Sequence, residues 1–332
     1  MSVGWGIVGI GFIADSGMAP AIATLDESHL EGVVSRDAER ARAFADKHHA
    51  SHAYTDFAEM LANPQVDAVL ITTPNALHAE QVVQAAKAGK HVLSDKPLAL
   101  SVAEAERAVD ECRRAGVKLG INFQTRHHTC FQESRNVIAA GGIGDPLVVQ
   151  LEVGAGAGGL KGWRTDPGLA GLGSINNVGV HGYDLLRFLL GAEVTEVVAL
   201  LDVGRKPELE TLAISLLRFD NGTLAYVNTN QKVPNHQPDI QIYGTKGRIV
   251  GHNITRPWLE DGELRVLTAE GESVTRHSSL DAFRRCVHAF NQAVLENTEP
   301  NASGTDGLRS VQLTEAMARS AREGKVVELR NQ

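Results

Sequence analysis

Cysteine is scarce in this sequence, and its spacing excludes several classes of protein. Only three cysteines occur in the 332 residues, Cys112, Cys130 and Cys286, and they lie far apart. A disulfide framework or a structural zinc site needs paired or closely spaced ligands, and neither CxxC nor HExxH is present. We therefore expect no metal site and a reducing, cytoplasmic environment.

An excess of basic charge and a long apolar run are also missing. The formal net charge is −8, and the lysines and arginines are scattered along the chain. The composition thus gives no reason to expect nucleic acid or a membrane as a partner. The apolar start over residues 3–14 lacks basic residues in front and ends at Asp15, so it predicts a strand and a turn rather than a signal peptide.

The first third of the chain alternates short apolar runs with helical patterns. Strands are expected over 3–8, 30–35, 52–54, 66–72, 91–93 and 117–123, and helices over 14–24, 38–48, 56–61, 78–88 and 102–115. This alternation is typical of βαβ units with a parallel sheet. It predicts an α/β fold that begins with a Rossmann (doubly wound) domain over residues 1–123.

The pattern changes after residue 123. Helices are expected over 131–139, 177–190, 280–297 and 305–323, while residues 194–276 form strand after strand separated by short turn signals. Short turns imply antiparallel pairing. Residues 124–332 are therefore expected to form an α+β domain with a large, mainly antiparallel open sheet.

A glycine-rich turn directly follows the first expected strand. It reads Gly9-Ile10-Gly11-Phe12-Ile13-Ala14 and opens a helix. The first glycine allows a tight turn, the second lets a pyrophosphate approach the backbone, and the small Ala14 lets helix and strand pack closely. In this context the turn predicts a dinucleotide site.

The end of the second expected strand bears on the choice of dinucleotide. An acid that accepts the ribose hydroxyls of NAD is expected about twenty residues after the turn. This chain has Ser35 there, followed by Arg36 and Asp37. A hydroxyl and a guanidinium suit a 2′-phosphate, so we favour NADP(H). NAD(H) stays open, because Asp37 adjoins and Arg36 could be a solvated residue at the helix start.

Two further strand ends carry polar residues. Thr72-Thr73-Pro74-Asn75 follows one strand and Asp95-Lys96-Pro97 follows the next. Ligands of doubly wound sheets bind at the carboxyl ends of the strands, so both segments are expected at the cofactor. Lys96 could hold substrate and nicotinamide together; alone, it would be interpreted as an exposed loop lysine. Our cofactor-binding assignment also includes His78, Asn122 and Gln124.

A helix of the second domain carries Asn177, His181 and Asp184 at positions i, i+4 and i+7, which share one face. His181 could move a proton, with Asn177 and Asp184 positioning the substrate. Asp184 could equally be a structural partner for a backbone amide or an arginine.

With these motifs in place, the chain resembles the glucose–fructose oxidoreductase, inositol dehydrogenase and MocA (Gfo/Idh/MocA) family over essentially its whole length. The family marker Glu-Lys-Pro is matched by Asp95-Lys96-Pro97, and the marker Asp-x-x-x-His by Asn177 to His181. The resemblance implies that Lys96 and His181 are catalytic and that Trp163 and Arg164 lie beside the cofactor. The stretch around Trp163 is also similar to the 1,5-anhydro-D-fructose reductase-like members.

The resemblance implies an NAD(P)-dependent oxidoreductase that interconverts alcohol and carbonyl on a sugar, polyol or related cyclic compound. It also implies that residues 124–332 bind the substrate and form the contacts of a homodimer or homotetramer through the C-terminal sheet. Asn177 departs from the family aspartate, so His181 lacks a neighbouring carboxylate at this position. Lys96 could take over the proton transfer, or the substrate could differ from ordinary sugars. Activity could also be weak or lost. A cofactor-binding regulator and an NAD-dependent glycosidase therefore stay open as rival functions.

Overall fold

The computed structural model describes residues 2–154, 160–203, 209–254, 262–277 and 281–329. They form two compact units. The first comprises residues up to Phe123 together with Phe283–Val311, and the second comprises Gln124–Ala282 with the chain from Gln312 onward. Among the described residues, no helix is both long and apolar enough to cross a membrane.

The first unit contains a six-stranded sheet in the order β3-β2-β1-β4-β5-β6, and every pairing in it is parallel. The strands are β1 (Val3–Val8), β2 (Ser28–Val34), β3 (His52–Tyr54), β4 (Ala68–Ile71), β5 (His91–Ser94) and β6 (Leu119–Ile121). Both β1 and β4 are buried along their whole length, as expected for central strands of a sheet covered on both faces. The predicted Rossmann domain is confirmed.

Helices connect these strands, and their ends follow local capping rules. They are α2 (Ala38–His48), α3 (Phe57–Ala62), α4 (His78–Lys87) and α5 (Val102–Ala115). Ser101 and Glu104 form a capping box at the start of α5, and Gly116 ends it with a left-handed φ of 69°.

The helix after the glycine turn differs from the single helix expected over 14–24. A π-helical turn, Ala14–Met18, precedes a short α1 (Ala19–Ala23). The Ala19 amide donates to the Ala14 carbonyl, five residues back, as a π-helix requires. Pro20 follows and has no amide hydrogen, so regular α-helical bonding cannot run through this segment.

Helix α9 (Ala282–Leu295) lies far along the chain, yet almost all of it belongs to the first unit. The Trp5 indole nitrogen donates to the Asn291 side-chain oxygen at 3.0 Å, and the ring of Phe290 lies 5.5 Å from that of Trp5. Gly120 also forms a bridge with Ser303. This return of the chain to the first unit was not expected from the sequence, and residue 280 of the helix expected over 280–297 lies outside the described residues.

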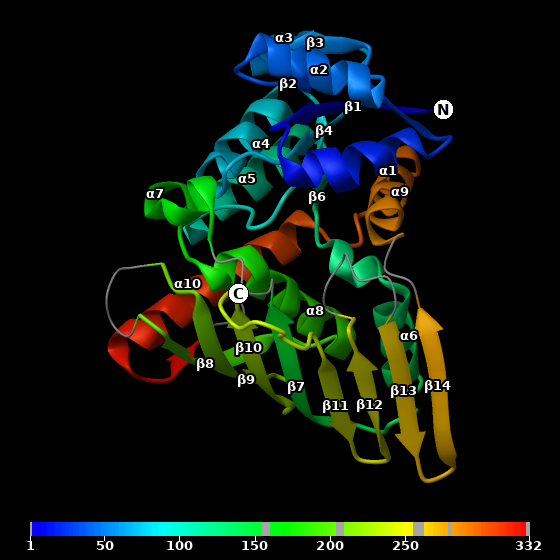
Figure 1. Cartoon of the computed structure of the whole chain (residues 1–332), viewed down its shortest axis with the longest axis vertical. Helices are drawn as coiled ribbons and strands as arrows, with labels where there is room; N and C mark the ends of the chain where they lie inside the picture. Colours follow the sequence, from blue (N-terminus) through cyan, green and yellow to red (C-terminus); the bar gives the residue numbers. More distant parts are fainter. Residues whose placement is uncertain (1, 155–159, 204–208, 255–261, 278–280, 330–332) are drawn as a thin grey trace. The chain divides into compact units, whose positions relative to one another are not determined.

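The second unit contains a nine-stranded sheet in the order β14-β13-β12-β11-β7-β10-β9-β8-β15 (Figure 1). Its strands are β7 (Pro146–Gly154), β8 (Val194–Leu201), β9 (Leu212–Phe219), β10 (Leu224–Asn230), β11 (Ile240–Gly244), β12 (Gly247–His252), β13 (Gly262–Thr268), β14 (Gly271–His277) and β15 (Val327–Glu328). The β7–β10 pairing is parallel and the others are antiparallel, so the prediction of a mainly antiparallel sheet is confirmed.

Helices α6 (Thr129–Ala139) and α8 (Val180–Leu190) lie on one face of this sheet (Figure 1). Glycine allows the close approach of α8, because a Cβ at Gly182 would lie 2.7 Å from a methyl group of Val153. The unit closes with α10 (Gly304–Glu323), which begins in the first unit. On the other face of the sheet, Leu200 and Leu216 are 69% and 55% exposed.

Candidate functional site

The expected cofactor residues line up along one edge of the six-stranded sheet. Neighbouring strands place Val34, Val8, Ile71, Ser94 and Ile121 in one row, in that order. Each predicted segment follows directly: Ser35-Arg36 after β2, the glycine turn after β1, Thr72–Asn75 after β4, Asp95–Pro97 after β5 and Asn122 after β6. Segments scattered over the first 122 residues thus gather at the carboxyl edge, where doubly wound sheets bind ligands.

The glycine turn is shaped by contact with the neighbouring strand end. Gly9 has a φ of 93°, and a Cβ there would lie 2.6 Å from the carbonyl carbon of Thr72. The Thr72 hydroxyl donates to the Gly9 carbonyl oxygen at 2.5 Å. At Gly11, by contrast, a Cβ would meet no atom within 4 Å. The turn is therefore held firmly on one side and open on the other, which fits a pyrophosphate against its backbone.

The flanking residues of the turn differ in exposure. Phe12 is 67% exposed, Ile13 is half-buried and Ala14 is fully buried. At the end of β2, Ser35 is half-buried and Arg36 is exposed. The Asp37 carboxylate accepts from the amides of Glu39 and Arg40 at 3.0 and 3.1 Å, capping α2. Asp37 is thus engaged by the helix start.

The Asp95-Lys96-Pro97 turn is stabilised by hydrogen bonds to the Asp95 side chain. The Asp95 carboxylate accepts from the Lys96 amide at 2.9 Å and from the Asn122 side chain at 3.4 Å. The Asn122 amide donates to the Ser94 carbonyl oxygen at 2.8 Å, and the Lys96–Pro97 peptide bond is cis. Lys96 is half-buried. Asp95 and Asn122 thereby fix the backbone from which Lys96 projects.

His78 joins two of these strand ends. Its side chain is fully buried, and its ring nitrogens lie 2.8 Å from the carbonyl oxygens of Pro97 and Thr73. The Thr73 hydroxyl in turn donates to Gln81 at 2.6 Å. Since both ring nitrogens face backbone oxygens, His78 ties these two strand ends together.

The second unit carries the other predicted residues at the start of a helix. A π-helical turn, Ile175–Gly179, runs directly into α8, with Asn177 in the turn and His181 in the first turn of α8. Both side chains are half-buried. Interruptions of this kind in a helix are frequent at functional sites. The sequence predicted one regular helix here, and the π-turn was not expected.

Asp184 has a partner that fits its structural interpretation. Its carboxylate accepts two hydrogen bonds from the Arg126 guanidinium, at 2.6 Å from Nε and 2.5 Å from Nη2. Asp184 is 1% exposed and Arg126 is 4% exposed. A bidentate pair with this burial is geometrically specific. Asp184 therefore anchors α8 to the turn Gln124–His127.

Glu210, which the sequence did not single out, caps the same π-turn. Its carboxylate accepts from the amides of Gly173 and Ile175 at 2.9 and 2.7 Å, and its carbonyl oxygen accepts from the Ser174 amide at 2.8 Å. The side chain is fully buried, and this burial raises the pKa of Glu210 above its ordinary value. One acid thus satisfies three amides at the helix start.

Trp163 and Arg164 lie in a short helical turn, Gly162–Thr165, of the second unit. The guanidinium carbon of Arg164 is 4.3 Å from the centre of the Trp163 ring, a cation–π contact. Arg164 Nε donates to the Asn177 side-chain oxygen at 3.0 Å, and Asn177 Nδ2 donates to Gln231 Oε1 at 2.7 Å. Gln124, also in this unit, is buried. Lys96 and His181 belong to different units.

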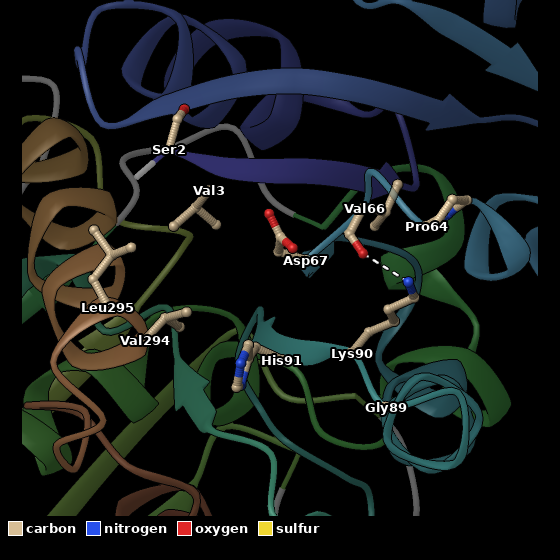
Figure 2. A pocket seen from close by; sticks show the side chains of 10 residues that line it. All are labelled: Ser2, Val3, Pro64, Val66, Asp67, Gly89, Lys90, His91, Val294 and Leu295. Atoms are coloured by element: carbon tan, nitrogen blue, oxygen red, sulfur yellow. Dashed lines mark hydrogen bonds between the residues drawn. The ribbon is translucent and has the colours of Figure 1, made fainter.

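A pocket of about 280 Å³ lies elsewhere in the first unit (Figure 2). Its lining includes Val3, Asp67 and His91, at the amino ends of β1, β4 and β5. The Lys90 ammonium donates to the carbonyl oxygens of Asn63 and Val66 at 3.0 and 2.7 Å, and burial lowers its pKa. This pocket is at the edge opposite the glycine turn, and its lysine ties two backbone segments together.

Comparisons with known proteins agree with this geometry. Residues 3–123 match the GFO/IDH/MocA oxidoreductase family with its NAD-binding Rossmann fold, and residues 131–250 match the GFO/IDH/MocA C-terminal domain. The 1,5-anhydro-D-fructose reductase of Ensifer adhaerens is 31% identical over 98% of both chains. A D-xylose 1-dehydrogenase (NADP(+)) of Haloferax volcanii is 30% identical over 98% of this chain and 99% of its own.

Among solved structures, an aldose–aldose oxidoreductase from Caulobacter crescentus superposes with a TM-score of 0.90. It is 28% identical, and the match covers 99% of this chain and 100% of the other. The resemblance seen in the sequence is confirmed, and the chain belongs to the Gfo/Idh/MocA family of NAD(P)-dependent oxidoreductases.

Proposed function

We propose that the protein prefers NADP(H) and interconverts an alcohol and a carbonyl on a sugar, polyol or related cyclic compound. The observation that carries this proposal is the position of Lys96, directly after β5 on the strand edge that also bears the glycine turn. The names of two relatives, a reductase of an anhydro sugar and a xylose dehydrogenase, support the substrate class.

In this proposal a bound nicotinamide supplies or accepts the hydride. The Lys96 ammonium polarises the reacting oxygen, and His181 gives or takes the accompanying proton. The Gly9–Ala14 turn and residues 72–75 hold the cofactor, with Trp163 and Arg164 beside it. The second unit binds the substrate. Asn177 acts on the site through Arg164, with which its side-chain oxygen shares a hydrogen bond.

The preference for NADP(H) rests on the end of β2. Arg36 is exposed there, and Ser35 holds the position of the acid that NAD sites favour. Asp37, the acid that could have weakened the preference, is engaged by the start of α2. An exposed guanidinium, beside a serine where NAD sites carry an acid, suits a 2′-phosphate.

We also propose a homodimer or homotetramer built on the uncovered face of the nine-stranded sheet. Val198, Leu216 and Tyr226 are direct cross-strand neighbours on this face, and Leu216 and Leu224 are 55% and 44% exposed. Apolar neighbours of this kind are normally covered. A reducing cytoplasm fits the three cysteines, which are buried thiols.

The test is turnover by purified protein with NADP(H) and NAD(H) against a panel of sugars, polyols and ketoses. Lys96→Met and His181→Ala should each lower the rate by roughly 10²–10⁴, while the exposed control Lys87→Met should match wild type. Near-wild-type turnover in both site variants would refute the proposed site. Cofactor binding without any turnover would indicate a regulator, and retained NAD without net redox change would indicate a glycosidase.

A further inference from the structure

Gln231 is the buried end of a hydrogen-bonded chain whose direction can be worked out. It follows β10 directly, is 1% exposed, and is anchored by its backbone amide, which donates to the Thr211 carbonyl oxygen at 2.9 Å. Its side-chain oxygen accepts from Asn177, whose own oxygen accepts from Arg164. The chain thus reaches from the sheet to the guanidinium that stacks on Trp163.

The arginine sets the direction of every bond in this chain. A guanidinium can only donate, so the atom of Asn177 that faces Arg164 must be its oxygen. The amide nitrogen of Asn177 then points to Gln231, which must present its oxygen. The orientation of both carboxamides follows from the network itself. Gln231 Nε2 is buried and has no hydrogen-bond partner among the described residues, so this carboxamide could turn without breaking a second bond.

We propose that Gln231 is a positioning residue of the site, which holds Asn177 with its oxygen toward Arg164 and thereby fixes Arg164 over Trp163. The part that Arg164 plays at the cofactor rests on the proposed function; the hydrogen-bond direction does not. This chain of amides explains how Asn177 can accept the hydrogen bond from Arg164 at the position where the family marker has an aspartate. An asparagine needs an acceptor at position 231, whereas an aspartate would need a donor, and a glutamine can supply either.

The test compares four variants: Gln231→Leu, Gln231→Glu, Asn177→Asp and the double variant Asn177→Asp/Gln231→Glu. Gln231→Leu removes the oxygen that accepts from the half-buried Asn177 side chain, so kcat/KM should fall about tenfold. Gln231→Glu keeps the acceptor, and Asn177→Asp lets Gln231 turn its amide, so each of these single variants should lose less kcat/KM than Gln231→Leu. In the double variant two carboxyl groups face each other, and kcat/KM at neutral pH should fall about a hundredfold.

Trp163 gives a readout that needs no turnover. The fluorescence of each variant minus that of the same variant with Trp163→Phe reports how Arg164 lies on the ring. We expect this difference spectrum to change in Gln231→Leu and in the double variant, and to stay as in wild type in the exposed control Gln237→Leu. A wild-type spectrum in Gln231→Leu, or a double variant no worse than the product of its singles, would overturn the inference. If wild type turns over no substrate, the proposed function fails, and the fluorescence alone decides the role of Gln231.

Discussion

Replacing Asp184 by asparagine should destabilise the second unit strongly. Arg126 and Asp184 are 4% and 1% exposed and share two hydrogen bonds of 2.6 and 2.5 Å. The asparagine oxygen could accept only one of them, and its NH2 group would face the other guanidinium N–H. Removing one partner of a buried ion pair costs about 3–5 kcal/mol, because the remaining charge stays uncompensated. For a unit of this size the melting temperature should fall on the order of 10 °C.

Urea and thermal unfolding measure this loss, with Asp145→Asn, an exposed acid of the same unit, as the matched control. The double variant Arg126→Met/Asp184→Leu should be more stable than Asp184→Asn, since both charges leave together. Turnover should follow the fraction of folded protein. Wild-type stability combined with lost turnover in Asp184→Asn would show that the acid acts in the reaction, and the structural interpretation would be wrong.

Three further predictions concern the cofactor, the helix start and the assembly. Arg36→Ala should weaken NADPH binding about tenfold to a hundredfold and leave NADH binding nearly unchanged, as measured by titration; tighter binding of NADH by wild type would contradict the assignment. Glu210 has a raised pKa, so its contribution to the free energy of unfolding is full below the unfolded value of 4.5 and is lost as pH rises through the folded pKa. The stability lost in Glu210→Gln should therefore be larger at low pH than at neutral pH, with Glu270→Gln, at an exposed turn of the same unit, as the control. Light scattering should give a multiple of 35.6 kDa for wild type and a lower mass for Leu216→Lys; a wild-type monomer would exclude the proposed assembly.

The first unit could be predicted from the sequence because its signals are local. Most strands are short apolar runs, several helices begin at a capping residue, and the glycine turn follows β1 directly. The edge of the sheet then brings Gly9, Thr72 and Lys96 together, since parallel strands share one direction. The row of strand ends in the structure confirms this reasoning for the fold.

The key contacts of the second unit could not be predicted from the sequence, because they join residues that are distant along the chain. Gln231 lies 54 residues from Asn177, and Glu210 lies 37 residues from Gly173. No sequence motif around Gln231 or Glu210 indicates which residue its side chain contacts. The π-turn before His181 was not predicted either, and Glu210, which caps its start, is distant in sequence in the same way.

The return of helix α9 to the first unit has a consequence for the order in which the protein is made. Trp5 emerges from the ribosome almost at once, but Asn291, its hydrogen-bond partner, follows 286 residues later. Residues 124–282 are synthesised in between, which takes roughly 10–30 s at about 5–20 residues per second. Throughout that interval the nascent Rossmann unit lacks the helix that packs on Trp5, so its apolar core can be completed only when nearly the whole chain has been translated.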